Sequence, residues 1–307
     1  MKDRAFGRGL FFSVSSFFLW GSLPLYWKLL AAIDPLHILA FRILFSLVLV
    51  GIILLAAKNT AWLEIFRPGK KAVQMILTSL IICINWGLYI WAINTGHTLE
   101  SSLGYYINPL VSIVLGLVFF REKLRPLQWA AVAVAFAGVL ILTVLSGVLP
   151  WISLALAITF GFYGLLKKKL SLSALESLGA ETLAAAPIGL FLLCFGFTGA
   201  PGGPRSVVFS GFHGLEYMSA LPVHTWVLLA LCGVATMFPL YCFARGTKLL
   251  PLSTVGFTQF VSPTIQFVLG LFVFGEAFPS ANFIAFAFIW TAVVLYIVSL
   301  KIAPVVN

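Results

Sequence analysis

The chain has 307 residues, of which 61% are hydrophobic and only 9% charged. A soluble domain carries about 25% charged residues, so this composition cannot cover an apolar core with a polar surface and excludes an ordinary soluble protein. The net charge of +10 would also suit a nucleic-acid-binding protein. Here, however, the cations lie in short segments between apolar runs, which is the pattern of cytoplasmic loops in membrane proteins.

Ten apolar runs follow one another along the chain, each close to the roughly 20 residues that a helix needs to cross a bilayer. The first follows Lys2, Arg4 and Arg8, as in a signal peptide, but it is too long and too aromatic, so we interpret it as a span. The runs lack the strict alternation of membrane strands. We therefore predict an all-α integral membrane protein with ten transmembrane helices, at about 9–28, 37–57, 72–94, 101–120, 127–145, 148–166, 178–198, 224–244, 252–274 and 282–300.

The basic residues fall almost entirely on one side of this ten-span arrangement. Only Lys28 and Arg205 reach the other side, and Arg42 lies inside the second run. Cytoplasmic loops are the ones enriched in Lys and Arg, so we predict that both termini are cytoplasmic. The Gly- and Pro-rich segment 199–223 then becomes a surface loop on the outer side.

An internal repeat divides the chain. The segment Pro109–Glu122 (PLVSIVLGLVFFRE) matches Pro263–Glu276 (PTIQFVLGLFVFGE) in seven of fourteen positions, at an offset of 154. The match relates the fourth run to the ninth, so each half holds five helices, 1–146 and 147–307. Because five is odd, the second half must enter the membrane from the opposite side. Such inverted repeats are typical of secondary transporters, with the substrate site near the midplane.

Two charged residues lie about five positions inside predicted spans, Arg42 in the second and Glu181 in the seventh. A charge within a membrane helix normally faces a wet cavity or a partner. We predict that both line a substrate cavity at symmetry-related positions, with Arg42 binding an anionic group or holding a gate and Glu181 acting as a proton site or inner gate. The alternative is a structural role, with Arg42 near Glu100 or Asp34 and Glu181 near Lys167–Lys169.

Amide and aromatic side chains occur in the same spans, several of them near prolines. An aromatic cage with a few amides suits an organic solute with an apolar body and a polar handle. Interfacial belts are the alternative for the aromatic residues, and interhelical hydrogen bonds for the amides. The cavity candidates of this kind are Trp20, Asn85, Trp86, Tyr89, Tyr105, Asn108 and Gln259.

Enzyme and cofactor motifs are absent from the sequence. There is no nucleotide-binding glycine loop, no HExxH and no pair of carboxylates within one span. The four cysteines lie in apolar runs without metal-ligand spacing and are interpreted as core residues. We predict no catalytic residue, no metal, no cofactor and no nucleic-acid partner.

Several motifs carry a resemblance to a known family. The most specific is Leu99–Leu110 (LESSLGYYINPL). Shorter ones are Trp20-Gly21, Arg42, Asn85-Trp86, Phe162-Tyr163-Gly164, Glu181 and Leu252–Phe257 (LSTVGF). With these, nearly the whole chain resembles the RarD group of the EamA family, in the drug/metabolite transporter superfamily. The resemblance implies ten helices in two inverted repeats around a cavity that exports or exchanges metabolites, and it adds Tyr163 to the cavity candidates. The Gly-Glu that the family usually has after the fourth span is Arg121-Glu122 here.

We therefore predict an inner-membrane permease or exporter that moves a small metabolite or drug-like solute by alternating access, with proton coupling left open. One alternative is a membrane sensor or scaffold without transport, which would need a partner protein. Another is an intramembrane lipid-linked transferase. The transferase would need clustered acids or a metal site, whereas the nine acidic residues are scattered.

Overall fold

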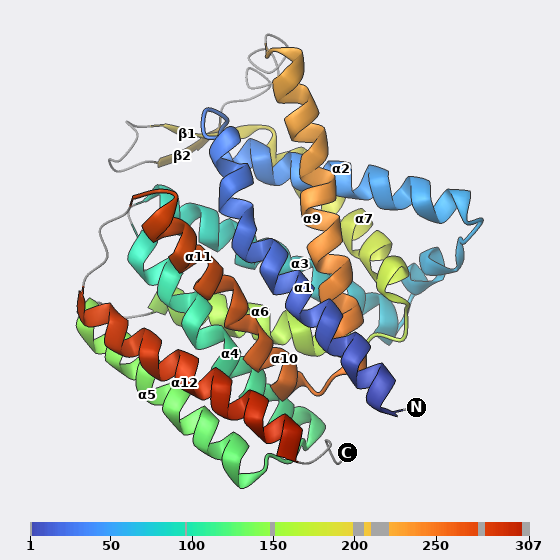
Figure 1. Ribbon diagram of the computed structural model, residues 1–307. Helices are drawn as coiled ribbons and strands as arrows, with labels where there is room; N and C mark the ends of the chain where they lie inside the picture. The colour runs from blue at the N-terminus through green and yellow to red at the C-terminus, as the bar shows by residue number, and fades with distance from the viewer. Residues whose placement is uncertain are drawn as a thin grey trace. The chain divides into compact units, whose positions relative to one another are not determined.

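The computed structural model describes residues 2–95, 97–147, 151–198, 206–209, 221–275 and 280–302 (Figure 1). The chain forms two compact units, and each is assembled from separate stretches of sequence. Unit 1 combines Met1–Ser22, Leu99–Leu165 and Arg245–Asn307, whereas unit 2 combines Leu23–Thr98 and Leu166–Ala244. Each unit therefore contains segments from both predicted sequence repeats.

Unit 1 is entirely helical in its described residues. Helices α5 and α12 lie along each other in opposite directions (Figure 1), so closely that a Cβ at Gly138 would come within 2.9 Å of Phe288 and 3.0 Å of the Ala285 carbonyl. The unit comprises most of α1 (Lys2–Leu29) and α6 (Trp151–Lys169), with α4 (Thr98–Phe120), α5 (Pro126–Ser146), α10 (Leu252–Gln259), α11 (Val261–Phe272) and α12 (Ser280–Ile302).

Unit 2 contains a second antiparallel helix pair, α2 and α7. Gly179 packs against Leu54 and Gly189 against Ile43, so residue numbers rise along one helix as they fall along the other. The unit comprises α2 (Pro35–Ala56), η1 (Ala61–Phe66), α3 (Lys70–Asn94), α7 (Ala174–Leu192), β1 (Phe195–Thr198), β2 (Ser206–Phe209) and most of α9 (Val223–Leu249).

Local sequence explains where α2 and α7 begin. The Asp34 carboxylate accepts the Leu36 N–H at 2.8 Å, and Pro35 occupies the first helical position, where its missing N–H costs nothing. At α7 the Ser173 hydroxyl accepts the Glu176 N–H while the Glu176 carboxylate accepts the Ser173 N–H. This capping box satisfies two backbone donors that a helix start leaves open.

Each of the ten predicted runs overlaps a helical segment. Among the described residues, nine segments are long and apolar enough to cross a membrane, with α10 and α11 counted together as Leu252–Phe272. The remaining segment is α6, whose last turn carries Lys167, Lys168 and Lys169 and is therefore more polar. The all-helical membrane fold is confirmed.

The ninth run forms two helices rather than one. Helix α10 ends at Gln259, Phe260 separates it from α11, and Pro263 follows in the first turn of α11. Proline has no N–H to bond the carbonyl four residues earlier, which is that of Gln259. All eight residues of α10 are buried, although four of them are Ser, Thr or Gln. Discontinuous helices of this kind occur at the binding sites of many transporters.

A short β-hairpin follows α7, where we had predicted that the seventh helix continues to residue 198. The helix ends at Leu192, and Phe195–Thr198 pair antiparallel with Ser206–Phe209. The rings of Phe195 and Phe209 lie 5.4 Å apart. Apart from β2, the predicted loop segment from 199 to 220 lies outside the described residues.

Corresponding helices of the two predicted repeats begin at regular offsets. Helices α4 and α10 begin at residues 98 and 252, and α5 and α12 at 126 and 280, an offset of 154 in both cases; α2 and α7 begin at 35 and 174, an offset of 139. The pairs α5–α12 and α2–α7 are antiparallel, as inversion requires. The contacts of Gly116 with Ser253 and of Gly256 with Pro109 show the same for α4 and α10. These pairings support the inverted five-helix repeat, which stays a prediction.

Candidate functional site

A small pocket lies within unit 2 among four helices, α2, α3, α7 and α9. There is room in it for about one water molecule. Both charged residues predicted for the cavity line it. The full lining is Arg42, Ile43, Ser46, Ile82, Cys83, Trp86, Glu181, Thr182, Ala185, Thr236 and Leu240.

The Arg42 side chain is half-buried and held by three neighbours from different helices. Its Nε donates to the Thr236 hydroxyl at 3.1 Å. The guanidinium carbon lies 4.9 Å from the centre of the Trp27 ring and 4.6 Å from that of Trp86. Such cation–π contacts contribute about 0.5–2 kcal/mol each, more when desolvated. The planar guanidinium is thus fixed in orientation, which suits it to bind a carboxylate or phosphate through two parallel hydrogen bonds.

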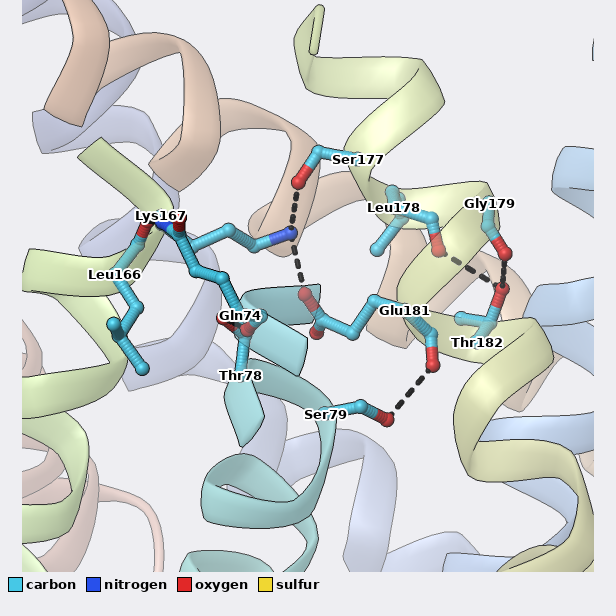
Figure 2. Close-up of polar contacts among 10 residues, drawn as sticks. All are labelled: Gln74, Thr78, Ser79, Leu166, Lys167, Ser177, Leu178, Gly179, Glu181 and Thr182. Carbon is cyan, nitrogen blue, oxygen red and sulfur yellow. Dashed lines mark hydrogen bonds and ion pairs between the residues drawn. The ribbon is translucent and has the colours of Figure 1, made fainter. Parts of the chain in front are cut away.

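Glu181 forms an ion pair with Lys167, and the two side chains are 3% and 1% exposed. Figure 2 shows the Lys167 amine between the Glu181 carboxylate and the Ser177 hydroxyl, to which it donates at 2.9 Å. A buried charge left without its counter-ion costs several kcal/mol. Lys167 therefore supplies the partner that a buried carboxylate at the pocket wall requires.

Helix α7 is held in place around Glu181 by neighbouring helices. The Ser79 hydroxyl on α3 donates to the Glu181 backbone carbonyl at 3.0 Å (Figure 2). On the α2 side, Gly179 lies so close to Leu54 that a Cβ would come within 2.7 Å of it. Interfaces of small residues let membrane helices approach closely. Because α7 is fixed on two sides, the direction of the Glu181 side chain is fixed too.

A separate buried polar group lies in unit 1, where α4 crosses α10. The Gln259 amide Nε2 donates to the Ser112 hydroxyl at 2.8 Å, and Asn108 lies one turn before Ser112 on α4. At the other end of α10, the Glu122 carboxylate accepts the N–H groups of Leu252 and Ser253 at 2.6 and 2.8 Å. Glu122 thus binds the positive end of the α10 dipole.

Known proteins resemble this chain over nearly its full length. The sequence profile of the EamA-like transporter family matches residues 7–144. The uncharacterized transporter YojE of Bacillus subtilis is 43% identical over 94% of this chain and 93% of its own length. Protein RarD of Streptomyces exfoliatus is 41% identical over 94% of this chain and 87% of its own. The chain belongs to the EamA-like transporter family. It is a multi-pass membrane protein of the drug/metabolite transporter superfamily.

The fold of this EamA-family chain also has a counterpart among solved structures. One crystal structure aligns with a TM-score of 0.68 over 95% of this chain and 98% of the other, at 17% sequence identity. At that identity the likeness concerns the fold alone. It agrees with the helical membrane architecture described above.

The predicted cavity residues of this EamA protein fall into the two units. Arg42, Trp86 and Glu181 line one pocket in unit 2. Asn85 and Tyr89 also lie on α3, in the same unit, but not in that lining. The other five belong to unit 1. They are Trp20, Tyr105, Asn108, Tyr163 and Gln259. The Trp20 ring lies 5.7 Å from that of Phe160, and Tyr163 is fully buried beside the same phenylalanine. Their roles in binding stay predictions.

Sequence reasoning missed Thr236 and Trp27, which contact Arg42, and placed Lys167 outside the spans. Neither was among the partners considered for Arg42 in the sequence, Asp34 and Glu100; the Glu100 side chain lies outside the described residues. We had assigned Lys167 to a cytoplasmic loop, but it lies in the last turn of α6 and is buried. A signal for Lys167 existed, because an acid as deep as Glu181 requires a partner and the three lysines had been considered for that role. The lysine that pairs with Glu181 is Lys167, the least exposed of the three.

Proposed function

We propose that this protein is an inner-membrane permease that moves a small organic solute by alternating access, and that the pocket of Arg42 and Glu181 is part of the solute pathway. The observation that carries the proposal is a group of buried charges inside apolar helices of an EamA-family chain. Ionisable residues in membrane helices are expensive and mark substrate or ion pathways. The relative YojE is itself named a transporter.

The pocket favours an anionic handle on the solute. Arg42 and Glu181 line the pocket, and Lys167 forms an ion pair with Glu181, so the formal charges of the three groups sum to one positive charge. The Arg42 guanidinium is oriented by two indole rings. Ile43, Ile82 and Leu240 on the pocket wall suit an apolar body. Since the pocket holds about one water molecule, solute binding requires the surrounding helices to separate. Helix movement of this kind is what alternating access supplies.

Glu181 is the residue we propose for proton coupling or an inner gate. Protonation of its carboxylate would remove the charge that holds the Lys167 amine. We infer cytoplasmic termini from the distribution of Lys and Arg, and this orientation would place Glu181 and Lys167 toward the inner side of the membrane. Reporter fusions at each terminus test that orientation. An enzyme that is active only in the periplasm should stay inactive at both ends.

Solute counterflow in proteoliposomes tests the function. Labelled amino acids, small organic acids and amphenicols are offered in pools, with and without a proton gradient. We expect uptake above empty liposomes from at least one pool, reduced at least tenfold by Arg42→Ala. Loss of gradient dependence in Glu181→Gln, in a protein that still folds, supports proton coupling at that residue. Unchanged transport in both variants would contradict the assigned roles, and absence of uptake from every pool would contradict transport of these solute classes.

A further inference from the structure

The junction of α10 and α11 in unit 1 holds two buried amides whose oxygens lack hydrogen bonds. Asn108 is 8% exposed and Gln259 is 3% exposed. Within the part of the chain that the structure describes, neither Asn108 Oδ1 nor Gln259 Oε1 has a hydrogen-bond partner. Leaving a buried acceptor unsatisfied costs about 1–3 kcal/mol. Two such groups in one place indicate that something absent from the protein chain completes them.

The two amides face the same place. The Gln259 amide is bonded to the Ser112 hydroxyl at 2.8 Å. Ser112 is four residues after Asn108, so Asn108 and Ser112 project from the same face of α4. The antiparallel contact of α4 with α10 puts the Pro109 carbonyl against Gly256, where a Cβ would come within 2.7 Å of it. Following this register, Asn108 lies level with the break at Phe260.

A backbone oxygen adds to the acceptors at this break. Pro263 cannot donate to the carbonyl of Gln259, so that carbonyl lacks an α-helical partner. Broken helices with free carbonyls are used to coordinate monovalent cations in transporters. The junction therefore offers neutral oxygen acceptors.

We propose that Asn108, Gln259 and the broken α10–α11 helix bind a monovalent cationic group, either a primary ammonium carried by the solute or an inorganic cation such as Na⁺. Both sources share the chemistry that the junction supplies, which is neutral oxygen acceptors. Ser112 is a positioning residue, because it accepts from the Gln259 Nε2 and thereby turns the Oε1 away from itself. If the ligand is an ammonium group of the solute, the inference rests on the proposed transport function. If the ligand is an inorganic cation, it does not.

Cation-dependent stabilisation of the full chain in lipid nanodiscs tests this. The midpoint of thermal unfolding is followed by tryptophan fluorescence while methylammonium chloride or NaCl replaces choline chloride at constant ionic strength. Choline is a cation without an N–H donor. We expect saturable stabilisation by methylammonium, by Na⁺ or by both, and the cation that acts identifies the source. Equal midpoints in all three salts would overturn the proposal.

Variants locate the site. Asn108→Leu and Gln259→Leu should raise the apparent Kd about tenfold or more, since each removes an acceptor from a charged ligand. Asn108→Asp keeps the shape and adds a negative charge, so it should lower the Kd, and it covers the case in which the leucine variants do not fold. Gln266→Leu is the matched control, because the Gln266 side chain on α11 is only half-buried. An unchanged Kd in Asn108→Asp would also overturn the proposal.

The result is independent of the counterflow experiment. Cation binding without solute flux would reject the transport function and leave the cation site standing. Solute flux in a protein whose unfolding midpoint is the same in all three salts would reject the cation site and leave the transport function standing.

Discussion

Arg121 and Gly275 adopt the same left-handed backbone conformation, with φ of 52° and 65°. They stand at positions 121 and 275, which differ by the same 154 residues as the sequence repeat, and each follows a helix of its half, α4 or α11. Glycine adopts this conformation without steric cost, whereas other residues do so at about 1–2 kcal/mol. The backbone requirement is thus common to both positions, although only one of them is glycine.

Replacing Arg121 with Gly should therefore stabilise the protein. We expect a gain of about 0.5–1 kcal/mol, because release of the strained φ outweighs the added freedom of the unfolded chain. Arg121→Val should destabilise it, since a β-branched residue tolerates positive φ poorly. The free energy of unfolding in detergent, measured by chemical denaturation, checks both. Equal stability of the Gly and Val variants would contradict a left-handed requirement at this position.

Glu122, the next residue, should be required for the docking of α10. Its carboxylate accepts two backbone N–H groups, and hydrogen bonds to charged groups contribute about 1.5–3 kcal/mol each. Glu122→Ala should therefore cost about 2–4 kcal/mol, and Glu122→Gln less.

Gly116 offers a matched test of the same contact. A Cβ there would lie 2.6 Å from the Glu122 Oε2, so Gly116→Ala alone should be destabilising. In the double variant with Glu122→Ala that clash is gone. The loss of stability should therefore be smaller than the sum of the two single losses. Additive losses would show that the two residues do not interact.

How far the sequence predicts this fold depends on the range of the interactions. Apolar runs of bilayer length are a local property, and every one of them overlaps a helical segment. The prediction that the seventh helix continues to residue 198 was wrong, because Phe195–Thr198 pair with a strand later in the chain. Such pairing leaves no local signal in the sequence. Arg42 was recognised as a charge within a span, but its partners Trp27, Trp86 and Thr236 come from three other helices. Only the packed structure brings them together.

The contact of α5 with α12 should tolerate no added methyl group. Gly138→Ala would push a Cβ to within about 3 Å of Phe288 and the Ala285 carbonyl, and overpacking of this kind costs about 1–3 kcal/mol. The control is Gly87 on α3, where no described atom lies within 4 Å of the added Cβ. Gly87→Ala should be neutral or stabilising, because Ala is the better helix former. Thermal unfolding of the two variants side by side checks this, and equal midpoints would contradict the close packing.

The Lys167–Glu181 pair should show strong coupling. Lys167→Met or Glu181→Gln alone leaves a buried charge without its partner and should destabilise the protein by about 3–5 kcal/mol. The double variant removes both charges and should recover most of that loss. Lys169→Met, on the same helical turn but exposed, is the control and should have little effect. If the double variant loses as much stability as the two single variants added together, the two side chains are not coupled and the ion pair does not stabilise the protein.

The two tryptophans around Arg42 should affect solute affinity more than stability. Trp86→Leu keeps an apolar side chain in the pocket but removes the ring face that lies 4.6 Å from the guanidinium carbon. Each ring contact contributes about 0.5–2 kcal/mol, so the apparent KM in counterflow should rise about two- to thirtyfold, while the maximal rate changes less. Thr236→Val, which removes only the hydroxyl acceptor of the Arg42 Nε, should act in the same direction. Arg42→Lys separates charge from orientation, because a lysine keeps the positive charge but loses the planar two-pronged donor. If Arg42→Lys transports as well as the unmodified protein, the orientation of the guanidinium does not contribute to binding, and the tryptophans then hold Arg42 for structural reasons alone.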